Sequence, residues 1–152
     1  MKLAYLILCH TDSEHIRRLV NKLLNKNTKI YIHVDLKSNI DEFKNKIPFH
    51  ENIHFIQNRV KVFWGGYSQV QATINLMDYA YKNAKHDRYI LLQGLDYPII
   101  SNDRIEKFFE SNKNVEFIRG CNISRSTEKY FYSKCVPKCV PNFIFRSLVH
   151  TI

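Results

Sequence analysis

The sequence predicts an α/β domain built on a mostly parallel sheet with helices on both faces. Three observations support this fold class. Short runs rich in apolar and β-branched residues alternate with stretches of helical periodicity along residues 1–120. Residues 3–9, LAYLILC, are apolar without interruption, as in a strand that is buried on both faces. The composition, 45% hydrophobic and 24% charged in 152 residues, is typical of one globular domain with a proper core.

Five segments have the pattern of strands. They are rich in β-branched and aromatic residues, and helical or turn segments separate them. Because strands and helices alternate, the strands are expected to run parallel. The predicted strands cover residues 3–9, 29–35, 52–58, 88–94 and 115–120.

The first predicted helix follows residues 3–9 after a short polar stretch. Thr11 and Glu14 have the spacing of a capping box, and Asp12 and Ser13 are alternative caps. A weaker helix is expected over about residues 40–47, ending before Pro48. The apolar face predicted for the first helix consists of Ile16, Leu19, Val20, Leu23 and Leu24.

Two further helices are predicted. Ser68 and Gln71 form a second capping box at the start of the third helix. Asp103 and Glu106 are the candidate caps of the fourth. The predicted buried faces are Val70, Ile74, Met77, Tyr81 and Ala84 on the third helix, and Ile105, Phe108 and Phe109 on the fourth.

The last part of the chain changes character. We divide the sequence into an α/β part, residues 1–120, and an irregular, basic, aromatic-rich tail, residues 121–152. The tail has two Val-Pro pairs and no clear period, and it carries five basic residues against Glu128 alone. It stops inside an apolar pattern without a turn or cap. We therefore expect the tail to be the start of a further half of the domain.

The net charge of +9 favours a polyanionic partner. No DNA- or RNA-binding motif appears and the basic residues do not gather on one helix, so we expect no nucleic-acid partner. No apolar run approaches the ~20 residues of a spanning helix, and MKLAYLILCH lacks a cleavage site. The expectation is a cytoplasmic protein, with peripheral contact to an anionic membrane left open.

The cysteines are expected to be free thiols, because no export signal is recognised. Cys135 and Cys139 lie near His150 and would supply half a zinc site, but a second pair is missing. Ordinary thiols are the favoured interpretation for all four: Cys9, Cys121, Cys135 and Cys139.

Candidate binding residues follow four of the predicted strands. In an open parallel sheet, ligands bind beyond the carboxyl ends of the strands. Polar residues and glycines gather at those positions: His10 after the first strand, Asp35 after the second, Trp64, Gly65 and Gly66 beyond the third, and Asp96 after the fourth.

Several of these residues also have structural interpretations. His33 and Asp35 share one face of a strand and could be metal ligands, but a satisfied core histidine and a capping aspartate are more common. Gly94-Leu95-Asp96 is equally consistent with a plain turn before Pro98. Dinucleotide-binding, P-loop and nucleophile-elbow motifs do not occur in the sequence.

The segment Trp64-Gly65-Gly66 favours a binding lip at a helix start. Glycines allow a positive φ or a close backbone approach, and helix N-terminal amides favour an anion. Trp64 would supply a flat wall. The alternative is a tight turn with Trp64 in the core.

Four segments together resemble one enzyme family. LAYLILCH, IYIHVDLKS, VFWGGYSQVQA and YILLQGLDYPI resemble, in this order, motifs of the core-2/I-branching glycosyltransferases, a family that includes peptide O-xylosyltransferases. The resemblance covers residues 3–100 and extends more loosely into the helix and strand that follow.

The resemblance implies a GT-A-like fold, in which residues 1–120 are the nucleotide-sugar-binding half. It implies transfer of N-acetylglucosamine or xylose from a UDP-sugar to a glycan or other hydroxyl acceptor, with inversion and without a metal or further cofactor. His10, Asp35, Trp64, Gly65, Gly66 and Asp96 occupy the positions of the family's nucleotide-side motifs. The family's catalytic base lies in the C-terminal half, so no catalytic residue is assigned here. A non-catalytic nucleotide-sugar-binding or scaffold domain is the alternative, and a basic nucleic-acid-binding module is the third.

Overall fold

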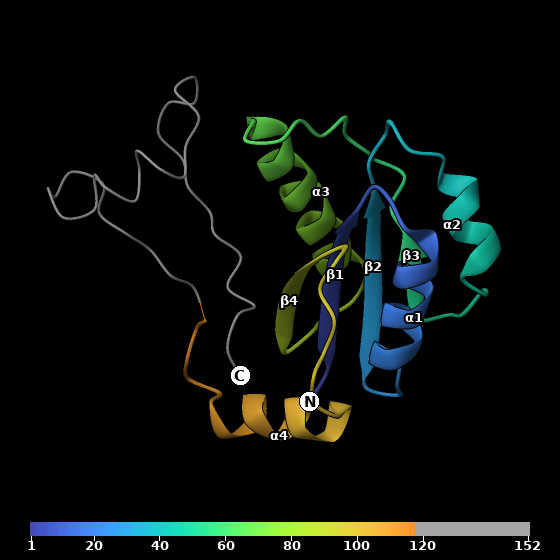
Figure 1. Cartoon of the computed structure of the whole chain (residues 1–152). Helices are drawn as coiled ribbons and strands as arrows, with labels where there is room; N and C mark the ends of the chain where they lie inside the picture. The colour runs from blue at the N-terminus through green and yellow to red at the C-terminus, as the bar shows by residue number, and fades with distance from the viewer. Residues whose placement is uncertain (118–152) are drawn as a thin grey trace, which may run out of the picture.

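The chain folds around a four-stranded parallel sheet with the strand order β3-β2-β1-β4 (Figure 1). The computed structural model of the chain describes residues 1–117. Both neighbours of β1 pair with it in parallel, as does β3 with β2, so the predicted α/β class with a parallel sheet is confirmed. The strands are β1 Leu3–Cys9, β2 Thr28–Val34, β3 Ile53–Phe55 and β4 Arg88–Gln93.

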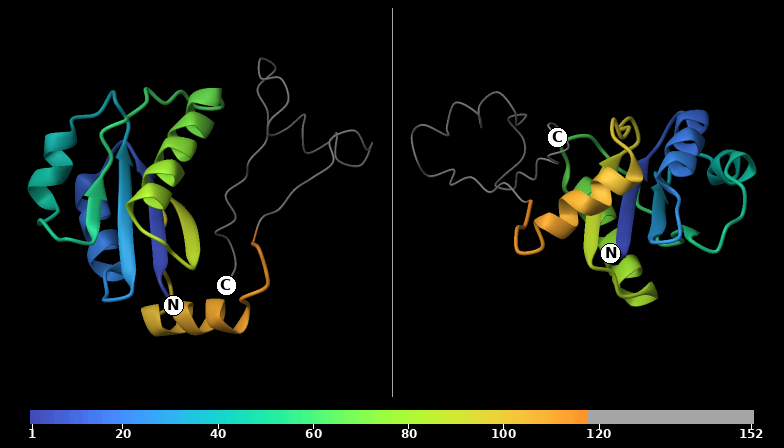
Figure 2. Two further views of the ribbon diagram at one scale, coloured as in Figure 1. Left: turned by 180° about the vertical axis from the view of Figure 1, so that it is seen from behind. Right: turned by 90° about the horizontal axis from the view of Figure 1, so that it is seen from below.

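Helices cover both faces of the sheet (Figure 2). Helices α1 (Ser13–Leu23) and α2 (Ile40–Lys46) pack on one face, and α3 (Tyr67–Asn83) packs on the other. Helix α4 (Asn102–Ser111) lies across the amino-terminal end of the sheet, where the Met1 amino group is 3.6 Å from Glu110. Within residues 1–117, no helix combines the length and apolarity needed to cross a membrane.

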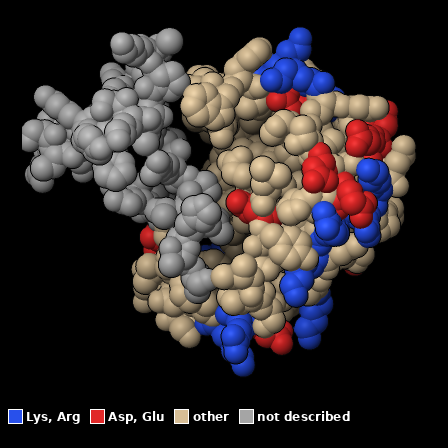
Figure 3. Space-filling view, in the orientation of Figure 1, with Lys and Arg blue, Asp and Glu red and all other residues tan. Residues whose placement is uncertain are grey.

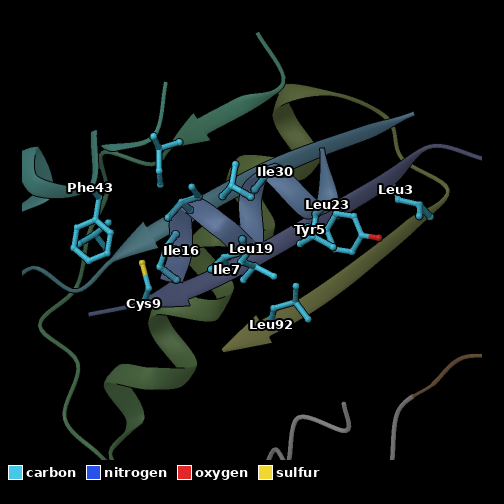
Figure 4. Close-up of a cluster of buried hydrophobic side chains, with 14 residues drawn as sticks. Leu3, Tyr5, Ile7, Cys9, Ile16, Leu19, Leu23, Ile30, Phe43 and Leu92 are labelled. Carbon is cyan, nitrogen blue, oxygen red and sulfur yellow. The ribbon is translucent and has the colours of Figure 1, made fainter. Parts of the chain in front are cut away.

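The core forms on both sides of β1 because its side chains alternate between the two faces. Leu3, Tyr5, Ile7 and Cys9 pack against α1 and α2 (Figure 4), whereas the intervening residues pack against α3. All seven residues of β1 are buried, which confirms the prediction of a strand covered on both faces. The apolar face predicted for α1 is also confirmed: Ile16, Leu19, Val20 and Leu23 are buried, and Leu24 packs against them.

The predicted buried face of α3 is wrong. The helix turns Ala72, Leu76 and Ala80 toward the sheet. Of the residues predicted to be buried, Met77 is 48% exposed and Tyr81 is 75% exposed. Two alanines on the buried stripe let the helix backbone approach the sheet closely. The larger side chains of the predicted stripe would hold the helix farther away.

Several boundaries differ from the predicted ones. Strand β3 has three residues where seven were predicted, because the chain turns away after Ile56, whose amide donates to the Ile32 carbonyl at 3.0 Å. Residues 115–117 do not form a strand. The rest of the predicted fifth strand, residues 118–120, and the tail, residues 121–152 with three of the cysteines, lie outside the described residues.

The helix caps also differ from the predicted boxes. Asp12, one of the alternatives, caps α1 with a left-handed backbone (φ 52°), and its side chain accepts the His15 amide at 2.8 Å. Ser101 is the N-cap residue of α4, two residues ahead of Asp103, where the predicted box begins.

Candidate functional site

The direction of chain winding reverses at β1. From β1 the chain winds outward through β2 to β3 with α1 and α2 on one face, then returns through α3 on the other face to β4. A reversal of this kind leaves a crevice beyond the carboxyl ends of the two adjoining strands, which is where nucleotides bind in doubly wound folds. His10 follows β1 and Asp96 follows β4, so the predicted residues occupy this switch point.

Asp35 lies on the β2 side of the same edge. Its amide donates to the Cys9 carbonyl at 2.8 Å, which continues the β1–β2 ladder past the strand ends. One carboxylate oxygen accepts the amides of Lys37 at 2.9 Å and Val62 at 3.4 Å, and the other lies 3.6 Å from the Lys37 ammonium. The side chain is almost fully buried. Asp35 therefore ties the end of β2 to the loop that leads toward α3.

Asp96 lies on the opposite side of the end of β1. One of its carboxylate oxygens accepts the Gln93 amide at 2.7 Å, and its own amide donates to the Gln93 carbonyl at 3.0 Å, which closes a tight turn. Its carbonyl is 3.2 Å from the His15 ring at the start of α1. The turn that the sequence left open as an alternative is thus present, and it brings Asp96 to the switch point.

Gly94 permits this turn. A Cβ at this position would lie 3.0 Å from the Cys9 Cβ and 3.3 Å from the Leu8 carbonyl oxygen. Asp35 and Gly94 therefore flank Cys9 from its two sides. The Cys9 thiol is buried, burial raises its pKa to about 12, and it donates to the His33 carbonyl at 3.7 Å.

His10 is exposed at the end of β1. Its carbonyl accepts the Ser38 hydroxyl at 2.6 Å, which links the loops that follow β1 and β2.

The lip, residues 64–66, projects from the loop between β3 and α3. Trp64 is 85% exposed, so it is not a core residue. Gly65 has φ 70°, which side chains rarely adopt, and a Cβ on Gly66 would lie 3.3 Å from the Phe63 carbonyl oxygen. Both glycines therefore meet the conformational expectation drawn from the sequence. The lip immediately precedes the N-terminus of α3 at the carboxyl end of the sheet (Figure 1).

The predicted capping box at Ser68 is wrong. The N-cap of α3 is Gly66, and the Ser68 hydroxyl instead accepts the Phe63 amide at 2.9 Å, five residues back. Ser68 thus closes the base of the lip.

Replacing Ser68 by alanine should lower the free energy of unfolding by about 1 kcal/mol, because the Phe63 amide loses its acceptor. Urea denaturation measures the change. Ser101→Ala is the matched control, since the Ser101 side chain makes no capping bond. Equal losses of unfolding free energy in the two variants would contradict the role of the Ser68 hydroxyl as the acceptor of the Phe63 amide.

His33 is a satisfied core histidine in this structure. It is buried, and its Nε2 accepts the Val60 amide at 3.0 Å. Burial is the largest influence and lowers the pKa of the imidazole; the backbone bond and then Asp35 raise it in part, and Arg59 lowers it by the smallest amount. Within residues 1–117, no group of three or more His, Cys, Asp or Glu side chains is arranged to hold a metal ion.

Lys37 and Arg59 are residues that the sequence did not single out for the site. The Lys37 ammonium donates to the Val62 carbonyl at 2.6 Å and lies 4.8 Å from the centre of the Phe63 ring. Arg59 donates to the carbonyls of Ser38 at 3.2 Å and Asp35 at 3.5 Å. The one feature of the sequence that could have pointed to Lys37 and Arg59 is that they follow the ends of β2 and β3.

Two surface hollows lie away from this edge. One is at the amino end of the sheet and is lined by residues that include Met1, Arg88 and Glu110. The other is an apolar hollow between α3 and β4, lined by residues that include Ile74, Met77 and Tyr89. In the space-filling view, Lys and Arg side chains are interspersed with acidic ones and form no continuous stripe on that face (Figure 3). Contact with an anionic membrane stays an expectation from charge alone.

The comparisons with known proteins agree on one group. The family model described as Core-2/I-Branching enzyme matches residues 3–146. Xylosyltransferase sqv-6 of Caenorhabditis elegans is 25% identical over 147 residues, covering 89% of this chain and 18% of that protein. Xylosyltransferase 2 of Mus musculus is 25% identical, covering 91% and 17%. Xylosyltransferase oxt of Drosophila melanogaster is 28% identical, covering 81% and 14%. The chain thus spans less than a fifth of the length of these relatives.

Proposed function

The chain belongs to the core-2/I-branching enzyme family, and from this membership we propose that residues 1–120 form the nucleotide-sugar-binding half of a glycosyltransferase domain. The tail, residues 121–152, would begin the acceptor half. The reaction is transfer of one sugar from a UDP-sugar to a hydroxyl group of a glycan or other acceptor, with inversion and without a metal. The names of the similar proteins favour xylose as the sugar, with N-acetylglucosamine as the other candidate.

The observation that carries the proposal is the reversal of the strand order at β1. It places His10 and Asp96 just beyond the carboxyl ends of β1 and β4, where doubly wound folds bind nucleotides, and Asp35 follows the adjacent β2. The exposed Trp64 borders the same edge and offers a flat surface to a uracil or sugar ring. Helix α3 begins directly behind it without an acidic residue in its first turn, so its N-terminal amides favour a diphosphate.

The chemistry needs two further groups. A carboxylate must deprotonate the acceptor hydroxyl as the sugar is displaced, and a cationic group must stabilise the departing UDP. Glu116 is not suited to the first role, because it pairs with Arg88 at 3.0 Å at the amino end of β4, the opposite end of the sheet. The family resemblance assigns both groups to the C-terminal half.

We expect UDP to bind in the millimolar range, near −4 kcal/mol, because the described residues supply only part of the contacts of a UDP-sugar. Trp64→Ala should weaken binding about fivefold, since stacking on an aromatic ring contributes on the order of 1 kcal/mol. Calorimetry with UDP measures both affinities. Trp64 is a cleaner target than Asp35, whose replacement would also release the loop that it anchors.

Phe49→Ala is the matched control. Phe49 is an aromatic residue that is 97% exposed, and it follows α2, away from the site. The Phe49→Ala substitution should leave both the UDP affinity and the stability of the protein unchanged. No detectable binding by folded protein at millimolar UDP would refute the proposed function, and equal losses in the two variants would refute the role of the lip.

A non-catalytic nucleotide-sugar-binding domain remains the second candidate, because the described site contains no assigned catalytic base. Both candidates bind UDP. A radiolabelled UDP-xylose or UDP-N-acetylglucosamine transfer assay separates them, since only a transferase moves the label to an acceptor.

A further inference from the structure

The loop between β3 and α3 is fastened to the end of β2 by three side chains, which we call the clasp: His33, Asp35 and Lys37. His33 accepts the Val60 amide at 3.0 Å, Asp35 accepts the Val62 amide at 3.4 Å, and Lys37 donates to the Val62 carbonyl at 2.6 Å. A backbone bond from the Leu36 amide to the Val60 carbonyl, at 3.0 Å, lies between them. The clasp therefore fixes the loop two residues before Trp64.

The lip is held by the clasp on one side and by contacts at the start of α3 on the other. Trp64 is exposed, and Phe63 is held by Ser68 and by the Lys37 ammonium near its ring. The lip is therefore held on its other side by α3, whose N-cap Gly66 donates its amide to the Phe63 carbonyl at 3.1 Å, and the clasp sets residues 60–62 directly before it.

We propose that His33 is a positioning residue for the lip, and that only its neutral imidazole can close the clasp. An amide N–H can donate to Nε2 only when that nitrogen carries a lone pair, so the ring proton must reside on Nδ1. Protonation of the ring would place a second N–H against the Val60 N–H. That bond would then be lost and replaced by a repulsive contact between two donors.

The groups around His33 determine the pH range in which its ring is protonated and its bond to the Val60 amide is lost. Asp35, which directly follows β2, and Arg59 on the loop are its charged neighbours with opposite effects, and the neutral Cys9 thiol of β1 bonds to its carbonyl. Helix α3 packs Ala72, Leu76 and Ala80 on this face of the sheet, and three of its polar side chains also reach the face or the loop beyond it: Asn75, Tyr79 and Asn83. Because burial lowers the pKa of His33 below its ordinary value of about 6.5, the clasp is closed at pH 7.5. The stability that it contributes is fully present above pH 6.5 and is lost as the pH falls through the folded-state pKa.

Two NMR signals report on the clasp directly. The first is the protection of the Val60 amide against hydrogen exchange, which we expect to be about tenfold lower at pH 5 than at pH 7.5 once intrinsic exchange rates are divided out. The second is the indole N–H of Trp64, the only tryptophan in the chain, whose heteronuclear NOE should fall over the same pH range.

Three variants of the full chain test the assignment. His33→Gln replaces Nε2 with an amide oxygen that accepts at every pH, so the protection of Val60 and the order of Trp64 should no longer depend on pH. His33→Leu removes the acceptor, so both signals should resemble the acid form at pH 7.5. His54→Gln is the matched control: His54 is on the neighbouring strand β3, and burial also lowers its pKa, but it is not part of the clasp. This variant should respond to pH like the unaltered protein.

A wild-type pH response in His33→Gln would overturn the proposal, as would the loss of that response in His54→Gln. If His33→Leu does not fold, the comparison of His33→Gln with His54→Gln decides alone. The link to binding rests on the proposed function: UDP affinity should fall from pH 7.5 to pH 5 in the unaltered protein and stay constant in His33→Gln. A folded protein that binds no UDP would refute the proposed function, while the Val60 and Trp64 signals would still decide the role of His33.

Discussion

Replacing Leu76 by alanine should lower the free energy of unfolding by about 3 kcal/mol. Leu76 is fully buried in the cluster between α3 and the sheet, where it packs with Leu6, Tyr31 and Ile56. Truncation of a leucine at such a site removes its transfer free energy and leaves a cavity that close-packed neighbours fill only in part. The loss should be measured by urea denaturation followed by circular dichroism.

Met77→Ala is the matched control, because Met77 is the next residue of the same helix and is 48% exposed. Alanine and methionine have similar helix propensities, so this change should stay within about 0.5 kcal/mol. A larger loss at Met77 than at Leu76 would show that the stripe predicted from the sequence, and not the observed one, faces the core.

The contrast between α1 and α3 shows what the pattern of apolar residues can predict. In α1 the apolar residues form a single stripe, so the buried face is unambiguous, and the uninterrupted run in β1 is equally clear. In α3 two stripes are apolar, and the sequence pattern alone favours the bulkier one. The choice of the stripe of alanines depends on how closely the helix approaches the sheet, which is a tertiary property that no local pattern contains.

The candidate site likewise has some features that the sequence pattern predicts and others that depend on tertiary contacts. The strand-end positions of His10, Asp35 and Asp96 followed from the predicted order of elements, because parallel strands end at one edge. The sequence could not predict the contacts of Asp35. Its carboxylate accepts a hydrogen bond from a loop that begins some twenty residues later in the chain and returns to the end of β2. The contact of Lys37 with the Val62 carbonyl could not be predicted for the same reason, because it is made with the same loop.

The strand-to-turn junction at Gly94 is the site where we expect the second large effect. Gly94→Val should destabilise the fold by about 3 kcal/mol and weaken any ligand binding at the switch point. Its Cβ would lie 3.0 Å from the Cys9 Cβ and 3.3 Å from both the Cys9 Cα and the Leu8 carbonyl oxygen, and two of these three are backbone atoms of β1. Overpacking of this kind costs about 1–3 kcal/mol in a well-packed core, and the additional methyl groups of valine place the expected loss at the upper end.

Neither side of this contact can move cheaply. Leu8 and Cys9 belong to the central strand, which is bonded on both sides, and the turn after Gly94 is closed by the bond from the Gln93 amide to Asp96. A double-mutant cycle with Cys9→Gly isolates the clash, because Cys9→Gly removes the nearest atom. The double variant should lose about 1 kcal/mol less than the sum of the two single variants. Strict additivity would contradict this steric account, and a Gly94→Val protein with unchanged stability would show that the turn and β1 are not packed as closely as the structure places them.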